Sequence, residues 1–377
     1  MARFTNAPLP SLKLLRKSLL RRSKPRDSFL DSWRTPNHLI VPLSRSAWSL
    51  KLIADYKLIQ SKRTYLNFLV PSYFCNSSLA PLREMKTNLV FYPIQKDGTP
   101  NMDEVNKILL EKKIDIIVGV HFFGSFMDFT ELSHIAREKN IWLVEDFAHI
   151  LNVPDKDRIK SDFQMFSPHK FLPISDGALL MVNKNIFMSE AEERNFIDLY
   201  NSSPFVERSF LKGYFWLFKR LLQKLNIGIH VGIKDFVHDE YINTSDGFFK
   251  PGMTNMSKSL LSVLTNFLEQ NKILRKENAQ AWMSLVLYRY PSAKILFAKE
   301  NTESIYLLGF EFSDLQELDE ALTWFNLKEF PICTWPDLPE EVLQNKDYFK
   351  NSIDLRNRCI FFQVHSSIDK KHIESSN

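Results

Sequence analysis

The sequence predicts an α/β fold, in which a mostly parallel sheet with helices on both faces is followed by a smaller C-terminal α+β domain. Between about residues 39 and 185, short apolar runs alternate with longer patterns of helical spacing. Strands that are joined through helices run parallel and are covered on both faces, whereas antiparallel neighbours need only short turns. A chain of 377 residues with 44% hydrophobic residues also has enough apolar material for two domains.

The strands of this sheet are expected where apolar residues follow one another and a turn signal ends the run. These runs lie at residues 39–41, 65–70, 89–92, 114–120, 142–144, 164–166 and 178–182. Helices are expected between them, at 47–60, 103–112 and 130–139. In such a sheet ligands bind beyond the carboxyl ends of the strands, so polar side chains at those ends are the first candidates for a site.

The second half of the chain contains two further helical patterns. Residues 210–225 form a basic amphipathic pattern, which fits either a packed helix with a solvated basic face or a helix that lies on a membrane surface. Residues 259–290 predict one long helix, because apolar residues recur there every three or four positions. The remainder predicts the small α+β domain, with strands at 304–309 and 359–364 and a helix at 314–325.

Three parts follow from this pattern: a basic N-terminal arm at 1–37, a large domain at 38–258, and a long helix with a small domain at 259–377. The arm carries eight basic residues before the first acid, Asp27. Such a stretch is typical either of an arm that leads into the fold or of a transit peptide.

Composition excludes several classes of function. A net charge of +5 is too small to predict a nucleic-acid partner. The 10 glycines form neither a Walker A loop nor a GxGxxG loop. Three widely spaced cysteines predict no disulfide framework and no metal site, and they favour a reducing cytoplasm. No apolar stretch reaches the ~18 residues that a membrane span requires.

Two residues carry the main chemical signal. Asp146 ends an apolar run, and Lys170 follows 24 positions later in a Ser-x-x-Lys turn between two apolar runs. This arrangement can hold pyridoxal 5′-phosphate: the lysine amine bonds to the cofactor aldehyde, and the carboxylate keeps the pyridine nitrogen protonated. A helix cap or a salt-bridge partner is the structural alternative for the acid, and an ordinary solvated lysine is the alternative for Lys170.

Further candidates surround this pair in the predicted fold. Ser167 and the helix start at Ser46 and Ala47 are candidates to bind the cofactor phosphate, because free backbone N–H groups and the helix dipole favour an anion there. A plain N-cap is the alternative for this helix start. The remaining candidates are His149, bonded either to Asp146 or to the ring hydroxyl, Phe74 or Cys75 stacked on the ring, and His121 and His169 on the substrate side.

Taken in order, these segments resemble the DegT/DnrJ/EryC1/StrS family of pyridoxal-phosphate enzymes. The resemblance covers roughly residues 38 to 366 and rests on a set of short segments. They are Ser44-Arg45-Ser46-Ala47, Val70-Pro71-Ser72-Tyr73-Phe74-Cys75, His121-Phe122-Phe123-Gly124 with Asp128, Glu145-Asp146-Phe147-Ala148-His149, Ser167-Pro168-His169-Lys170 with Asp176-Gly177, Asn255-Met256-Ser257, Cys333-Thr334-Trp335-Pro336, and Val364-His365.

The resemblance implies a divergent sugar aminotransferase with the aspartate-aminotransferase fold (fold type I). It implies glutamate as amino donor, a keto-sugar nucleotide as acceptor, and a role in cell-surface polysaccharide or related biosynthesis. It also implies a homodimer, in which the segment after Asn255 approaches the cofactor of the partner subunit. Two alternatives stay open: a non-catalytic relative that keeps the fold, and a relative with a dehydratase or lyase reaction. Dehydratases of this family have histidine in place of the lysine, so Lys170 disfavours that route.

Overall fold

The computed structural model describes residues 8–11, 14, 27–155, 158–202, 211–224, 251–297 and 304–376. Most of the predicted N-terminal arm, including its basic residues before position 27, lies outside these ranges. Its described end forms a short 3-10 helix, η1 (Asp27–Trp33), whose Trp33 is fully buried.

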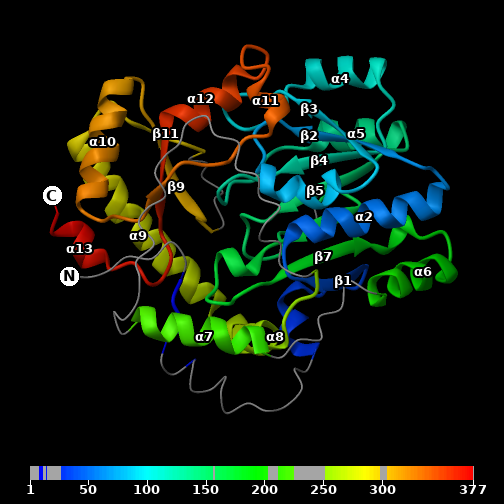
Figure 1. Ribbon diagram of the computed structural model, residues 1–377, viewed down its shortest axis with the longest axis horizontal. Coiled ribbons are helices and arrows are strands. Elements are labelled where there is room, and N and C mark those ends of the chain that lie inside the picture. Colours follow the sequence, from blue (N-terminus) through cyan, green and yellow to red (C-terminus); the bar gives the residue numbers. More distant parts are fainter. Residues whose placement is uncertain are drawn as a thin grey trace.

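A seven-stranded sheet forms the centre of the molecule (Figure 1). Its order is β1 (His38–Leu43), β7 (Ala178–Asn183), β6 (Phe163–Phe166), β5 (Trp142–Phe147), β4 (Ile116–Val120), β2 (Leu66–Pro71) and β3 (Thr87–Tyr92). Strand β7 pairs antiparallel with both of its neighbours, and all other pairs are parallel. The predicted mostly parallel sheet is therefore confirmed.

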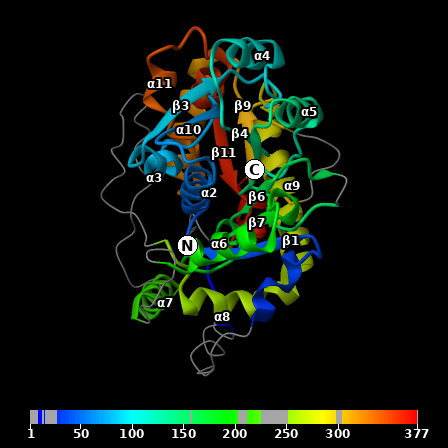
Figure 2. The same ribbon diagram turned by 90° about the vertical axis from the view of Figure 1, so that its right-hand side faces the viewer.

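Helices cover both faces of this sheet, and in Figure 2 they stand on either side of it. Every residue of β4 and β5 is buried, which explains why β4 and the first half of β5 appear in the sequence as apolar runs. The helices of this part are α2 (Ser46–Ser61), α3 (Ala80–Arg83), α4 (Met102–Glu111), α5 (Thr130–Glu138) and α6 (Glu190–Asn201), with short 3-10 helices η2 (Asn76–Leu79) and η5 (Lys184–Ile186). Helices α2, α4 and α5 lie where the sequence predicts them.

A second, antiparallel sheet lies in the C-terminal part of the chain. Its order is β10 (Ile332–Cys333), β11 (Cys359–Gln363), β9 (Leu307–Glu311) and β8 (Lys294–Ile295). Helices α10 (Leu315–Leu327), α11 (Glu340–Leu343), α12 (Lys350–Arg358) and α13 (Lys370–Glu374) complete this part. Its core is aromatic: Trp282 packs on Phe330 and Phe362 with ring centroids 4.9 Å apart in each pair. The domain boundary at 258 stays a prediction.

The single long helix expected over residues 259–290 is divided in the structure. Helix α8 (Asn255–Leu264) ends in a 3-10 turn, η7 (Thr265–Phe267), and α9 (Leu268–Arg289) follows. Side chains along this stretch bond back to the carbonyl three residues earlier: Ser262 to Ser259 at 2.8 Å, and Asn266 to Val263 at 3.4 Å. Such bonds compete with the helical ladder, which accounts for the interruption.

The basic amphipathic pattern over residues 210–225 forms helix α7 (Leu211–Lys224). Leu217 is buried, whereas Phe215 and Phe218 are exposed. No helix in the described part of the chain combines the length and the apolar character that crossing a membrane requires.

Gly119, in the middle of β4, allows a close approach of the Phe129 ring. A Cβ atom at Gly119 would lie 2.8 Å from that ring, which is 2% exposed. We expect Gly119→Ala to lower the free energy of unfolding by about 1–3 kcal/mol through overpacking. In urea denaturation, combining it with Phe129→Leu should cost less than the sum of the two single changes. A Gly119→Ala protein within about 0.5 kcal/mol of the parent would contradict this packing.

Candidate functional site

A small pocket lies at the carboxyl ends of β4 and β5, where most of the predicted residues gather. Asp146 is the penultimate residue of β5, and Lys170 ends a 3-10 helix, η4 (Pro168–Lys170), after β6. The pocket is lined by Ser46, Phe74, Cys75, Ser78, Val120, Asp146, Ala148, His149, Lys170 and Trp335. Six predicted residues, from four separate segments of the chain, therefore share one pocket.

Asp146 is a buried carboxyl group at the base of this pocket. Its Oδ1 accepts a hydrogen bond from the Ala148 backbone N–H at 2.8 Å. Burial raises the pKa of Asp146, while the charge of Lys170 and the bond from Ala148 act in the opposite direction. A carboxylate that is poorly solvated gains most from a cationic N–H group placed beside it.

Lys170 supplies the amine of the pocket. Burial lowers its pKa, and the negative charge of Asp146 is the largest opposing influence. Its Nζ lies 5.4 Å from the centre of the Tyr306 ring. A lowered pKa increases the fraction of neutral amine, which is the nucleophilic form.

His149 presents a hydrogen-bond donor to the same pocket. Its Nδ1 accepts a bond from the Phe123 backbone N–H at 3.3 Å. Burial holds its pKa well below the ordinary value, so the ring is neutral and its proton is on Nε2. Nε2 is buried and has no hydrogen-bond partner among the described residues. A ligand oxygen at this position would satisfy it.

Ser167 is a second buried group without a partner. Its side chain is fully buried, and Oγ makes no hydrogen bond in the described part of the chain. It lies on the turn of Lys170, whose backbone N–H donates to the Ser167 carbonyl at 2.9 Å. Ser46, the first residue of α2, lines the pocket itself. Ala47 is buried behind it and does not line the pocket.

Phe74 and Cys75 follow β2 and line the pocket from the side of that strand. The Cys75 thiol donates a hydrogen bond to Asp337 Oδ1 at 2.9 Å. Burial raises the pKa of Cys75 to about 12, and the carboxylate of Asp337 adds to the shift. The thiol is therefore protonated and is a poor nucleophile at neutral pH.

The two histidines predicted on the substrate side lie outside the pocket lining. His121 is buried beside Glu145, with 3.6 Å between Nε2 and Oε1, and its Nδ1 accepts the Met127 N–H at 3.0 Å. Glu145 and Asp146 point to opposite faces of β5, so His121 accompanies the residue that faces away from the pocket. His169 bonds through Nδ1 to the Gly177 carbonyl at 2.8 Å, which ties the lysine turn to the next loop.

Three residues that are not among the predicted site residues complete the surroundings, and only Trp335 belongs to a segment that carries the resemblance. The Tyr306 ring stacks on His149 with centroids 4.5 Å apart, and Trp335 meets His149 edge-on at 5.1 Å. Arg275, from α9, is 1% exposed and bonds to the carbonyls of Phe171, Ile305 and Tyr306 at 3.0, 3.1 and 3.2 Å. Arg275 thus fixes both Tyr306 and the residue after Lys170. The one sequence signal for this role is that an arginine stands within the apolar helical pattern of residues 259–290.

The polar groups of the pocket fit a pyridoxal ring, but the free space is small. The cavity measures about 20 Å³, close to the ~10–15 Å³ that one water molecule occupies. Trp335 is the largest side chain of the lining. A ring-sized ligand therefore enters only when lining side chains such as Trp335 move.

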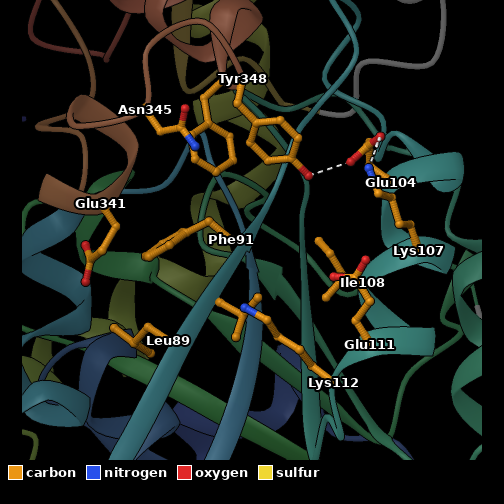
Figure 3. Close-up of a pocket in the computed structure, with 12 residues that line it drawn as sticks. Leu89, Phe91, Glu104, Lys107, Ile108, Glu111, Lys112, Glu341, Asn345 and Tyr348 are labelled. Carbon is orange, nitrogen blue, oxygen red and sulfur yellow. Dashed lines mark hydrogen bonds and ion pairs between the residues drawn. The ribbon is translucent and has the colours of Figure 1, made fainter.

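A larger cavity of about 360 Å³ lies elsewhere, between β3, α4 and the segment from α11 to α12 (Figure 3). At its rim the Tyr348 hydroxyl donates to Glu104 Oε2 at 2.6 Å. None of the predicted site residues lines this cavity. The convergence of the Asp146 carboxyl group, the Lys170 amine and the unsatisfied His149 donor distinguishes the smaller pocket as the candidate site.

Comparison with known proteins supports the family resemblance and the fold. Residues 66–192 match the model of the DegT/DnrJ/EryC1/StrS aminotransferase family. This match contains Phe74, Cys75, Asp146, His149, Ser167 and Lys170. It confirms the resemblance over about a third of the chain.

Solved structures share the fold over nearly the whole chain. Spr1654 of Streptococcus pneumoniae, described as a sugar aminotransferase and solved in its PLP form, has a TM-score of 0.73 and 15% identity, over 99% of this chain and 96% of that one. Helicobacter pylori PseC, an aminotransferase in pseudoaminic acid biosynthesis, has a TM-score of 0.69 and 13% identity, over 99% and 96%. The E. coli GDP-4-keto-6-deoxy-D-mannose-3-dehydratase with bound hydrated PLP has a TM-score of 0.65 and 15% identity, over 98% of each chain. The predicted fold class is thereby confirmed.

The raised pKa of Asp146 predicts a pH-dependent effect on stability. An acid whose pKa is higher in the folded state stabilises the fold while it is protonated, and this contribution is lost as the pH rises through the folded-state pKa. In cofactor-free protein, Asp146→Asn should therefore raise the free energy of unfolding near pH 7, by on the order of 1 kcal/mol. The gain should shrink as the pH falls toward the ordinary carboxyl pKa of 3.8.

Urea denaturation between pH 4.5 and 7.5 measures this effect. Asp319→Asn, at an exposed position of α10, is the matched control and should show no such trend. A gain for Asp146→Asn that is constant with pH, or a loss that grows with pH, would refute the assignment of a destabilised carboxylate.

Proposed function

We propose that this chain, whose residues 66–192 carry the DegT/DnrJ/EryC1/StrS aminotransferase match, is an aminotransferase that depends on pyridoxal phosphate. The observation that carries the proposal is the convergence of Lys170, Asp146 and His149 on one pocket at the carboxyl ends of parallel strands. The carboxyl group of Asp146 suits the ring nitrogen, the N–H of His149 suits the ring oxygen, and the amine of Lys170 suits the aldehyde.

The residues divide the work by their chemistry. Asp146 would hold the ring nitrogen in its protonated form through a charge-assisted hydrogen bond. His149 would donate from Nε2 to the ring oxygen, and Ser167 with the start of α2 would receive the phosphate. When bound, pyridoxal phosphate supplies an aldehyde carbon and a ring that withdraws electrons from the reacting carbon.

Lys170 has two tasks in this arrangement. Its neutral amine would hold the cofactor through the aldehyde carbon, with loss of water, and during transfer Nζ would accept and return the proton that moves between the two reacting carbons. The lowered pKa suits both tasks, because an amine that is always protonated can neither attack a carbonyl nor accept a proton.

We further propose glutamate as the amino donor and a keto-sugar nucleotide as the acceptor, in cell-surface polysaccharide or related biosynthesis. This is supported by the family match and by neighbours such as PseC. A homodimer in the cytoplasm belongs to the same proposal. The E. coli dehydratase shares the fold, but Lys170 favours amino transfer over the dehydratase route.

Absorbance spectroscopy tests the proposal. Full-length protein reconstituted with pyridoxal phosphate should show the visible band of a lysine-bound pyridoxal group, and glutamate should bleach that band as the amino group is transferred. Lys170→Ala should lose the band, while Lys276→Ala, at an exposed position of α9, should keep it. A protein with no band would favour a non-catalytic relative. A band that glutamate leaves unchanged would favour another reaction or another donor.

A further inference from the structure

His121 begins the loop of residues 121–127, which lies between β4 and α5. Its backbone N–H donates to the Asp146 carbonyl at 3.1 Å, so the loop starts on the strand that carries the acid of the site. Its Nδ1 accepts the N–H of Met127 at 3.0 Å. The side chain of the first residue therefore binds the backbone of the last one, and His121 closes the loop.

The ring of His121 is itself held in one orientation. Because Nδ1 accepts a hydrogen bond, the ring is neutral and its proton is on Nε2. This Nε2 lies 3.6 Å from Oε1 of Glu145, which is longer than a hydrogen bond but close enough for a buried carboxyl oxygen to orient an N–H group. Glu145 is fixed in turn through Oε2, which accepts the Lys160 N–H at 3.0 Å and the Ser161 hydroxyl at 2.7 Å.

The middle of the loop contains a strained residue that contacts the proposed site. Phe123 has φ 54°, a left-handed conformation that a bulky side chain rarely adopts, and Gly124 follows with φ 106°. In this conformation the Phe123 N–H donates to Nδ1 of His149 at 3.3 Å, and the Phe123 carbonyl accepts the Tyr306 N–H at 3.1 Å. Such a conformation persists only where neighbouring contacts enforce it, and the bond from Met127 to His121 is one of these contacts.

The contact from Phe123 determines which nitrogen of His149 carries the proton. A neutral imidazole has one N–H group, so an Nδ1 that accepts a bond leaves the proton on Nε2. Nε2 is the buried atom that has no partner among the described residues and that would donate to the cofactor oxygen. A loop that relaxes frees His149 to turn or to take its other tautomer, and this donor is then lost.

We propose that His121 is a positioning residue of this site: it holds the loop of residues 121–127 so that the Phe123 N–H keeps the His149 donor directed at the cofactor oxygen. The inference rests on the proposed function, because this oxygen belongs to pyridoxal phosphate. It gives His121 a role that needs no contact with cofactor or substrate.

The test measures the pH midpoint at which the visible band of the lysine-bound pyridoxal group titrates in full-length protein. His149→Phe keeps an aromatic ring, removes the donor to the cofactor oxygen, and should shift this midpoint by about one pH unit. His121→Leu should shift it in the same direction by at least about half as much, because the Met127 N–H loses its acceptor. The double variant should shift it no further than His149→Phe alone, since both changes remove the same contact.

Two conservative variants separate the roles of the two ring nitrogens. His121→Asn places an acceptor where Nδ1 was and should restore the parent midpoint, whereas His121→Gln places its amide where Nε2 was and should behave like His121→Leu. This pair decides the question if His121→Leu does not fold. Val286→Ala is the control for a general loss of stability, since Val286 is buried in the aromatic core of the C-terminal part, and it should leave the midpoint unchanged.

Several results would overturn the inference: a parent-like midpoint for His121→Leu or for His149→Phe, full additivity of these two changes, equal shifts for His121→Asn and His121→Gln, or a shift of similar size for Val286→Ala. If the parent shows no visible band, the proposed function fails and the inference fails with it. A parent band that His121 variants leave unchanged rejects the inference alone.

Discussion

The site depends on two ionisable groups that the fold keeps away from water, the carboxyl group of Asp146 and the amine of Lys170. Burial raises the pKa of Asp146 and lowers that of Lys170, so that it favours the neutral form of each group. The attraction between the two charges only partly opposes these shifts. The parallel register of β5 and β6, with Asp146 opposite Met165 and Phe147 opposite Phe166, fixes how the two turns beyond the strands meet. A buried pair of this kind lowers the free energy of unfolding, and a ligand that interacts favourably with both groups raises it again.

The C-terminal part of the chain completes the pocket that the large sheet begins. Tyr306 and Trp335 enclose His149, and the Trp335 carbonyl accepts a bond from the Tyr73 hydroxyl at 2.7 Å. Arg275 holds the Phe171 and Tyr306 carbonyls together from α9, and burial lowers its pKa to about 9. The position of Lys170 is thus set both by its own strand and by a helix about a hundred residues later.

Local patterns predicted much of the fold and most of the pocket. Apolar runs located all seven strands of the large sheet, because buried parallel strands carry apolar side chains on both faces. Asp146, His149 and Lys170 were predictable because strand ends meet at one edge.

The contacts of Tyr306, Trp335 and Arg275 were not predictable, since they depend on how distant segments pack. Whether His121 lies in the pocket depends on the face of the sheet to which its side chain points. The alternation of side chains along a strand does not determine this for a residue just beyond the strand end. The break at Thr265–Phe267 depends on side-chain bonds to the backbone rather than on apolar spacing.

The most direct test of the central claim is to locate the bound cofactor on the chain. Protein incubated with pyridoxal phosphate is reduced with borohydride, digested and mapped by mass spectrometry. One dominant adduct is expected, on Lys170, and Asp146→Asn should reduce its yield because the ring nitrogen loses its partner. An adduct spread over exposed lysines, or none at all, would contradict it.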